Sequence, residues 1–115
     1  MRLLIVDDST LVQEQIKNDL AETFIELEFE VASTGIEALE KQRRFNPDVV
    51  FLDYIIPAPD GLAVLEILTR VNKNIKIIMA SSLTKQKYIY NKCVDCGAFA
   101  ILTKPLRKEE LLKTF

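Results

Sequence analysis

The sequence predicts a doubly wound α/β fold, in which helices cover both faces of a five-stranded parallel sheet. Short apolar runs alternate with segments of helical period, which is the pattern of a repeated strand–helix unit. Strands buried on both faces are expected to be continuously apolar. Four of the runs end in polar, reactive residues: LLIV precedes Asp7 and Asp8, VVFL precedes Asp53, IKIIMA precedes Ser81, and AILT precedes Lys104.

Length and composition predict one domain. The chain has 115 residues, of which 49% are apolar, and this is enough for one core without metal or disulfide bonds. We therefore expect residues 1–115 to form a single domain. The N-terminal apolar run is too short for a signal peptide or a membrane span, so we expect a cytoplasmic protein that makes no membrane contact.

Ten elements are expected in strict alternation. The predicted strands are Leu3–Val6, Ile25–Ala32, Val49–Leu52, Ile75–Ala80 and Phe99–Leu102. The predicted helices are Thr10–Glu22, Gly35–Phe45, Gly61–Val71, Thr84–Cys96 and Arg107–Phe115. The last helix is either short or cut before its natural end.

Local signals support several helix ends. The four-residue patterns that begin at Thr10 and Thr34 both have the form of a capping box, in which a side-chain oxygen accepts a hydrogen bond from a free backbone N–H. Asp60 is placed to cap the third helix. Gly97 stands where the fourth helix needs a residue that tolerates positive φ.

The second predicted strand differs from the others, because its sequence IELEFEV alternates apolar and acidic residues. Ile25, Leu27, Phe29 and Val31 would face one side and the glutamates the other, which indicates an exposed edge strand. Together with right-handed crossovers, this edge position suits the strand order 2-1-3-4-5, although the pattern alone does not fix that order.

Charge is distributed unevenly along the chain. Residues 1–83 hold 8 basic and 14 acidic side chains, net −6, and residues 84–115 hold 7 and 3, net +4. The sequence has no basic stripe with interleaved aromatic residues, so nucleic-acid binding is not predicted. The basic final third is either a docking face for an acidic protein or an ordinary solvated surface.

The two cysteines form the pattern Cys93-x-x-Cys96, which is found in redox pairs and zinc sites. The chain has no histidine and no further cysteine to complete a zinc site. The pattern also falls inside a predicted helix, where positions three apart share a face. We therefore expect both cysteines to be small buried side chains.

Acidic residues follow two of the predicted strands. Adjacent strands would bring Asp7, Asp8 and Asp53 close together, and like charges at short range resist ionising together. A divalent cation resolves this conflict, and oxygen ligands with room for water favour Mg²⁺. The sequence thus predicts a magnesium site at the carboxyl edge of the sheet.

The same edge carries residues suited to phosphoryl transfer. A carboxylate can act as a nucleophile and become an aspartyl phosphate, and Asp53 is the best candidate for this role. Lys104 would supply positive charge to a phosphoryl oxygen, and Ser81 a hydroxyl donor. Each of these two residues is a weak signal alone, but their common position at strand ends strengthens the prediction.

Four motifs together resemble the receiver domain of response regulators in two-component signalling. They are VDDS at 6–9, DYIIPAPDG at 53–61, ASS at 80–82 and TKP at 103–105, and they occur in the family's order over the whole chain. The resemblance implies the flavodoxin-like (βα)5 sandwich with a sheet of order 2-1-3-4-5. It also implies a cytoplasmic, phosphorylation-dependent signalling switch rather than an enzyme.

The resemblance further implies a role for each residue at the predicted site. Asp53 would accept phosphate, Asp8, Asp53 and the backbone carbonyl of Ile55 would bind Mg²⁺, and Asp7 would assist. Ser81 and Lys104 would contact the phosphoryl group, and the peptide between Lys104 and Pro105 would be cis. Because the chain has no histidine, the phosphodonor would be a separate histidine kinase or phosphotransfer protein.

Two features depart from the family pattern, and two further positions bear on the lifetime of the phosphorylated state. Ile101 stands where these domains commonly carry a tyrosine or phenylalanine that reports phosphorylation. Ile55 and Leu83 are aliphatic at positions that the family places beside the phosphoryl group, so we hypothesise that they exclude water and lengthen the phosphorylated state. The segment from Ser81 to Gly97 is also about one residue longer than usual.

Two other functions are compatible with the same residues. One is a small Mg²⁺-dependent phosphohydrolase, although Asp53-Tyr54-Ile55 lacks a second aspartate to act as acid and base. The other is an interaction domain that is never phosphorylated.

If the domain is a switch, the signal would pass through residues 81–115 to a protein partner or to a missing C-terminal output domain. Leu111, Leu112 and Phe115 would lie at this contact face or simply in the core.

Overall fold

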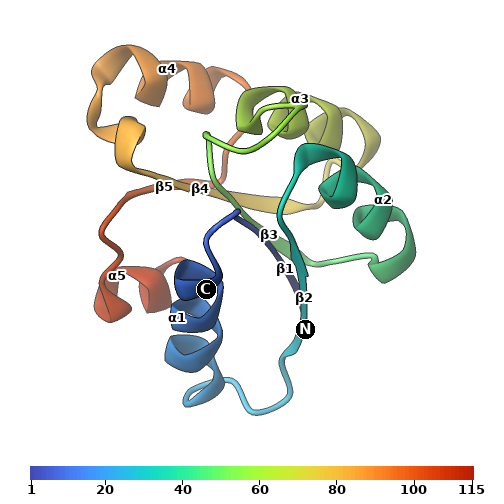
Figure 1. Ribbon diagram of the computed structural model, residues 1–115, viewed down its shortest axis with the longest axis vertical. Helices are drawn as coiled ribbons and strands as arrows, with labels where there is room; N and C mark the ends of the chain where they lie inside the picture. Colours follow the sequence, from blue (N-terminus) through green and yellow to red (C-terminus); the bar gives the residue numbers. More distant parts are fainter.

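The computed structural model describes residues 1–115 and contains one parallel sheet of five strands in the order β2-β1-β3-β4-β5 (Figure 1). The strands are β1 Arg2–Val6, β2 Glu28–Ala32, β3 Val49–Leu52, β4 Lys76–Ser81 and β5 Ala100–Thr103. The helices are α1 Thr10–Ala21, α2 Gly35–Phe45, α3 Gly61–Val71, α4 Lys87–Asp95 and α5 Lys108–Lys113, with a 3-10 helix η1 at Ser82–Lys85. The predicted fold class and strand order are confirmed.

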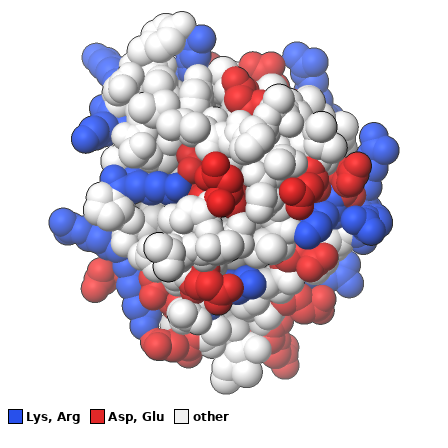
Figure 2. Space-filling model, in the orientation of Figure 1, with Lys and Arg blue, Asp and Glu red and all other residues white.

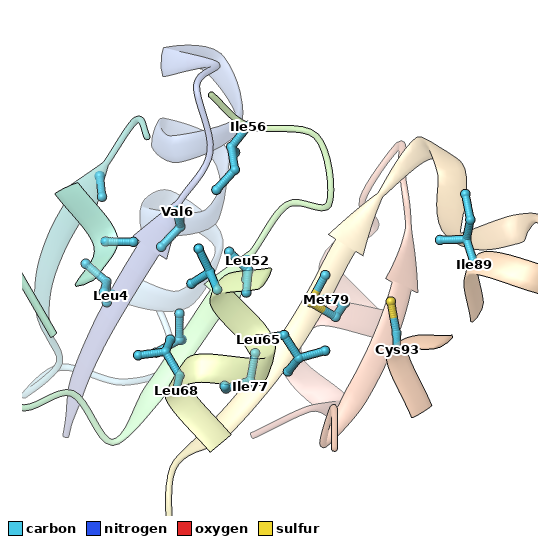
Figure 3. Packing of buried hydrophobic residues seen from close by; sticks show 14 residues of the cluster. Leu4, Val6, Leu52, Ile56, Leu65, Leu68, Ile77, Met79, Ile89 and Cys93 are labelled. Atoms are coloured by element: carbon cyan, nitrogen blue, oxygen red, sulfur yellow. The ribbon is translucent and has the colours of Figure 1, made fainter. Parts of the chain in front are cut away.

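Helices cover both faces of the sheet. In Figure 1, α1 and α5 lie together on one side of it, and α2, α3 and α4 lie on the other. Alternate strand residues supply two separate cores, because successive side chains of a strand point to opposite faces. Leu3 and Ile5 pack toward α1 and α5, and Leu4 and Val6 toward the other three helices. Figure 3 shows the latter core, where α3 and α4 close over the sheet.

The second strand is at the edge of the sheet, as predicted, but it begins at Glu28 rather than Ile25. The chain first turns after α1, where the Phe24 and Leu27 amides bond to nearby carbonyls. Phe24 packs into the α1/α5 core, and this leaves Ile25 91% exposed. The predicted common face therefore holds for Leu27, Phe29 and Val31 and is wrong for Ile25.

The fourth predicted helix is divided in two. The Ser81 side chain caps a single 3-10 turn, and the extended backbone of Gln86 separates this turn from α4. The predicted start at Thr84 is wrong because its hydroxyl bonds to the carbonyl oxygens of Ser81 and Leu102, on β4 and β5. The bounds of the other elements differ from prediction by one or two residues, or not at all.

Three of the four predicted helix caps are confirmed. The Thr34 and Asp60 side chains accept hydrogen bonds from backbone amides of α2 and α3, and Gly97 has φ 96° after α4. The capping box at Thr10 is wrong, because Ser9 caps α1 instead. Gln13, the expected partner in that box, donates its side-chain N–H to the Asp7 carbonyl.

The cysteines and the C-terminal apolar residues belong to the interior. Cys93 is fully buried, Cys96 is partly buried, and both are free thiols packed with the core under α3 and α4. Leu111 is buried in the α1/α5 core, and Leu112 and Phe115 are partly buried and pack against it, so these side chains belong mainly to the core. No helix is long and apolar enough to cross a bilayer.

Candidate functional site

Parallel strands bring the predicted site residues to one edge of the sheet. Asp7 directly follows β1, Asp53 follows β3, Ser81 ends β4 and Lys104 follows β5. Because β1, β3, β4 and β5 are neighbours in register, their carboxyl ends open at the same edge.

The ammonium group of Lys104 lies between two nearly buried carboxylates. Its Nζ donates to Asp7 Oδ2 at 2.6 Å and to Asp53 Oδ2 at 2.6 Å. The acidic side chains are 4% and 8% exposed, whereas the lysine side chain is 20% exposed. One cation thus holds together two carboxylates that would otherwise repel each other. On the face of the molecule shown in Figure 2, acidic side chains gather near the centre, and a basic side chain reaches them.

The second oxygen of each carboxylate is fixed by the backbone. Asp7 Oδ1 accepts the Ser9 amide at 2.9 Å, and Asp53 Oδ1 accepts the Ile55 amide at 3.0 Å. In each case the aspartate side chain accepts the amide two residues later, and this bond closes a short turn directly after the strand. Both carboxylates are therefore oriented by bonds on two sides.

The loop after Asp53 approaches α3 closely. The Gly61 amide donates to the Tyr54 carbonyl at 3.0 Å. A Cβ at Gly61 would overlap the Asp53 carbonyl oxygen and lie 2.6 Å from the Tyr54 Cα. Only glycine fits here, so this residue sets the position of the loop that carries Asp53 and Ile55.

Burial and ion pairing act in opposite directions on the charged groups. Burial raises the pKa of Asp7, and the hydrogen bond from Lys104 only partly offsets this effect. Burial also tends to lower the pKa of Lys104, but its hydrogen bonds to Asp53 and Asp7 outweigh that tendency, so the pKa of Lys104 is raised. The lysine therefore stays protonated at neutral pH.

Three of the predicted residues lie outside the contact between Lys104 and the two buried carboxylates. Asp8 is exposed beside Asp7, and no group of three or more acidic or cysteine side chains is gathered closely enough to form a metal centre. Ser81 is fully buried, and its Oγ accepts the Leu83 amide at 3.3 Å. Ile55 has a side chain 52% exposed, so it does not seal the crevice in this state.

The oxygen atoms nevertheless suit a hard cation. The oxygens of Asp7 and Asp53 already flank one cationic atom at 2.6 Å, and Asp8 adds a third carboxylate at the adjacent position. Mg²⁺ is commonly held by one or two carboxylates and completes its coordination with water, which the exposed Asp8 side of this site admits. The residues present therefore fit such an ion.

The site is not a small-molecule cavity. The three clefts of the molecule have volumes of about 350, 190 and 320 Å³, and all lie elsewhere. The largest is at the opposite edge of the sheet, between Asn46 and Lys76. A phosphoryl group would reach Asp53 from an open face.

The family model for the response regulator receiver domain matches residues 3–115. The chain belongs to this family. As a receiver domain homologous to CheY, it is a phosphorylation-dependent signalling switch. The resemblance seen in the sequence motifs is thus confirmed.

Chemotaxis proteins are among the most similar relatives of this receiver domain. CheY of Bacillus subtilis (strain 168) is 30% identical over 112 residues, which cover 97% of this chain and 92% of the relative. CheY of Treponema pallidum (strain Nichols) is 32% identical over 114 residues, which cover 97% and 78%. A protein-glutamate methylesterase/protein-glutamine glutaminase of Archaeoglobus fulgidus is 37% identical, but this chain covers only 30% of it.

Solved structures share the fold closely. A chain of the CheX–CheY–BeF3–Mg complex from Borrelia burgdorferi has a TM-score of 0.89 at 30% identity, with 99% of this chain and 85% of that chain covered. A CheY-like receiver domain protein from Methanospirillum hungatei JF-1 has a TM-score of 0.87 at 28% identity, with 97% and 87% covered.

The structure brings Asp7, Asp53 and Lys104 into direct contact and places Ser81 on the adjoining strand. Sequence reasoning missed Thr84, which connects the ends of β4 and β5. A hydroxyl residue three positions after a strand end is a weak signal, because such residues are common in turns. The Lys104–Pro105 peptide is cis, as expected, and the Ala58–Pro59 peptide is also cis.

Proposed function

We propose that Asp53 is the residue of this receiver domain that accepts the phosphoryl group. The observation that carries the proposal is a buried carboxylate at a strand end with Lys104 Nζ at 2.6 Å. In the transfer, an Asp53 oxygen would form a bond to phosphorus while the bond from phosphorus to the donor breaks. The electron pair of that bond leaves with the donor.

Lys104 and Ser81 would stabilise the transferred group. The ammonium of Lys104 already lies beside the Asp53 oxygen, so it is placed to pair with a phosphoryl oxygen that arrives there. Ser81 accepts a hydrogen bond from Leu83 through Oγ, which leaves its hydroxyl proton free to donate. These two contacts would favour the charge that develops during transfer.

Asp7, Asp8, Asp53 and the backbone carbonyl of Ile55 would hold Mg²⁺. Receiver domains generally bind this ion, and the oxygen atoms described above fit it. When bound, the ion would neutralise negative charge that the carboxylates and the phosphoryl group bring together.

The phosphodonor would be a separate protein, since this chain has no histidine. A histidine kinase or a histidine phosphotransfer protein fits that role. The output would pass to a protein partner, or to a C-terminal output domain if residues 1–115 form one domain of a longer chain. The only covalent chemistry would be phosphorylation and dephosphorylation of the domain itself, because no substrate cavity lies at Asp53.

A labelling experiment tests the proposal. The protein is incubated with Mg²⁺ and acetyl phosphate, and phosphorylation is followed by intact mass. We expect wild type and Asp95→Asn, at an exposed acid of α4, to be labelled equally. Asp53→Asn should not be labelled. Equal labelling of Asp53→Asn would reject Asp53 as the acceptor, and labelling unaffected by EDTA would reject the metal requirement.

A further inference from the structure

Thr84 is a buried hydroxyl residue beside the site that the proposed chemistry does not use. It lies in η1, and its exposed fraction is only 1%. Its Oγ1 atom is 2.8 Å from the Ser81 carbonyl oxygen, 2.7 Å from the Leu102 carbonyl oxygen and 3.2 Å from Thr103 Oγ1. One side chain therefore connects the end of β4 with the end of β5.

The Thr84 hydroxyl has two carbonyl acceptors within reach but only one proton to donate. A hydroxyl carries one proton, whereas two carbonyl oxygens lie within hydrogen-bond distance of it. The Thr103 hydroxyl can in turn donate to the Thr84 oxygen. Two hydrogen-bond arrangements thus compete in a buried place, where an unmade bond is costly. Because the two distances are nearly equal, a displacement of β4 relative to β5 would favour one arrangement over the other.

Ser81 connects this hydroxyl to the candidate site. The Ser81 carbonyl accepts the Thr84 hydroxyl and also the Lys104 amide, at 3.1 Å. Movement of Ser81 toward a phosphoryl group would change both bonds together. Because η1 ends at Lys85 and only Gln86 separates it from α4, a change in the partner of Thr84 would be passed to the start of that helix.

Aromatic rings do not provide this connection. Ile101 is aliphatic and packs against the core, while Tyr88, Tyr90 and Phe99 are exposed. Two of these rings lie under lysines on the surface, with Lys92 Nζ 4.6 Å from the Tyr88 centroid and Lys76 Nζ 4.8 Å from that of Phe99. The buried link at this end of β4 and β5 is polar.

We propose that Thr84 is the positioning residue that couples phosphorylation to η1, α4 and β5. It does so by moving its hydrogen bond between the Ser81 and Leu102 carbonyl oxygens. The inference rests on the proposed function of Asp53. It assigns the coupling to a hydroxyl proton, in a chain whose residue 101 is not aromatic.

Amide hydrogen exchange of the full chain tests the coupling. Wild type, Thr84→Val, Thr84→Ser and Thr69→Val are compared with and without Mg²⁺ and acetyl phosphate, and labelling at Asp53 is measured in the same samples. The readout is the phosphorylation-dependent change in exchange over residues 82–91 and 99–104. Thr69 is the matched control, because its hydroxyl also bonds to carbonyl oxygens, but on α3 and at Cys96.

We expect Thr84→Val to be labelled to within about two-fold of wild type, because Thr84 does not touch the acceptor. Its phosphorylation-dependent exchange change should fall by about five-fold or more, which is the lower end of ordinary coupling between sites. Thr84→Ser and Thr69→Val should keep the wild-type change. If Thr84→Val does not fold, Thr84→Ala replaces it with the same expected outcomes.

A labelled Thr84→Val protein with a wild-type exchange change would overturn the inference, as would a labelled wild type with no change in these two segments. Absence of labelling in wild type would instead reject the proposed function, and this inference with it. Because labelling and exchange are measured separately, the two failures are distinguishable.

Discussion

Lys104 pairs with two carboxylates that are almost fully withdrawn from water. A buried ion pair adds little net stability, but removing one partner is costly because the other charges are left unpaired. In the absence of metal, the lysine is therefore needed for the stability of the folded state as well as for the proposed chemistry. Gly61 has a comparable double role, since it positions the loop after Asp53 and also begins α3.

Lys104→Met is expected to lower the free energy of unfolding in EDTA by about 2–4 kcal/mol, because Asp7 and Asp53 are left as like charges without a cation. Urea unfolding measures this loss. Mg²⁺ should restore more stability to the variant than to wild type, since a bound cation replaces the missing charge. Lys85→Met, at an exposed lysine without an ion pair, should change stability by less than about 0.5 kcal/mol.

Gly61→Ala is expected to lower the free energy of unfolding by about 3 kcal/mol, because the new Cβ meets the backbone of Asp53 and Tyr54. Labelling with acetyl phosphate should fall as well, since the loop that carries Asp53, the proposed acceptor, must move. Gly97→Ala is the comparison, as its Cβ would meet only the Thr69 side chain, at 3.3 Å, which a small shift of that side chain relieves, and the positive φ is the main cost. That variant should lose about 1 kcal/mol and keep normal labelling. Equal effects of the two variants would contradict the steric explanation.

At the scale of elements, the sequence predicts the type and order of the strands and helices better than the residues at which they begin and end. Continuous apolar runs locate β1, β3 and β4 because strands buried on both faces are apolar throughout and these runs are too short for helices. The start of β2 is misplaced because Ile25 continues an alternating pattern, while the chain is turned by Phe24. The start of α4 is misplaced because hydrogen bonds to β5, distant in sequence, hold Thr84 in a 3-10 turn. Both errors come from tertiary contacts that a local pattern does not contain.

Phe24→Ala and Ile25→Ala test the turn between α1 and β2. Phe24 packs in the α1/α5 core, with its ring 5.2 Å from that of Phe115, so its loss should cost about 2–3 kcal/mol. Ile25 is exposed, and its replacement should change stability by less than about 0.5 kcal/mol. Chemical denaturation of both variants provides the measurement. A large loss for Ile25→Ala would indicate that β2 extends to residue 25 after all.

The inner face of α4 carries a thiol whose ionisation should affect stability at alkaline pH. Burial raises the pKa of Cys93, with a smaller contribution from Cys96. Below the pKa of an unfolded thiol, about 8.5, both states keep the proton and the contribution to stability is complete. As pH rises from there through the folded-state pKa, the unfolded chain ionises first and stability falls.

Urea unfolding at about pH 7 and about pH 9.5 measures this effect. Wild type should lose more stability between the two conditions than Cys93→Val, which has no thiol at that position. A thiol reagent should also modify Cys96 faster than the fully buried Cys93 in the folded protein. Equal pH dependence of the two proteins would contradict the assignment to Cys93.

At the scale of the whole molecule, the sheet determines which part of the candidate site could be foreseen. The meeting of Asp7, Asp53 and Lys104 follows from strand ends and parallel topology, which the sequence predicts. The exposed position of Asp8 and the contacts of Thr84 did not follow. They depend on side-chain geometry between segments far apart in the chain, where a few tenths of an ångström decide whether a bond forms.

The strand order also separates what must stay constant from what is free to vary. Asp53 extends from β3, which has a hydrogen-bonded neighbour on each side, whereas Lys104 extends from β5, which has one neighbour. Substitutions along the outer side of β5 and on α4 leave the central strands and their acids unchanged. Over evolutionary time, such a domain can acquire new protein partners and still respond to phosphorylation at the same edge of the sheet.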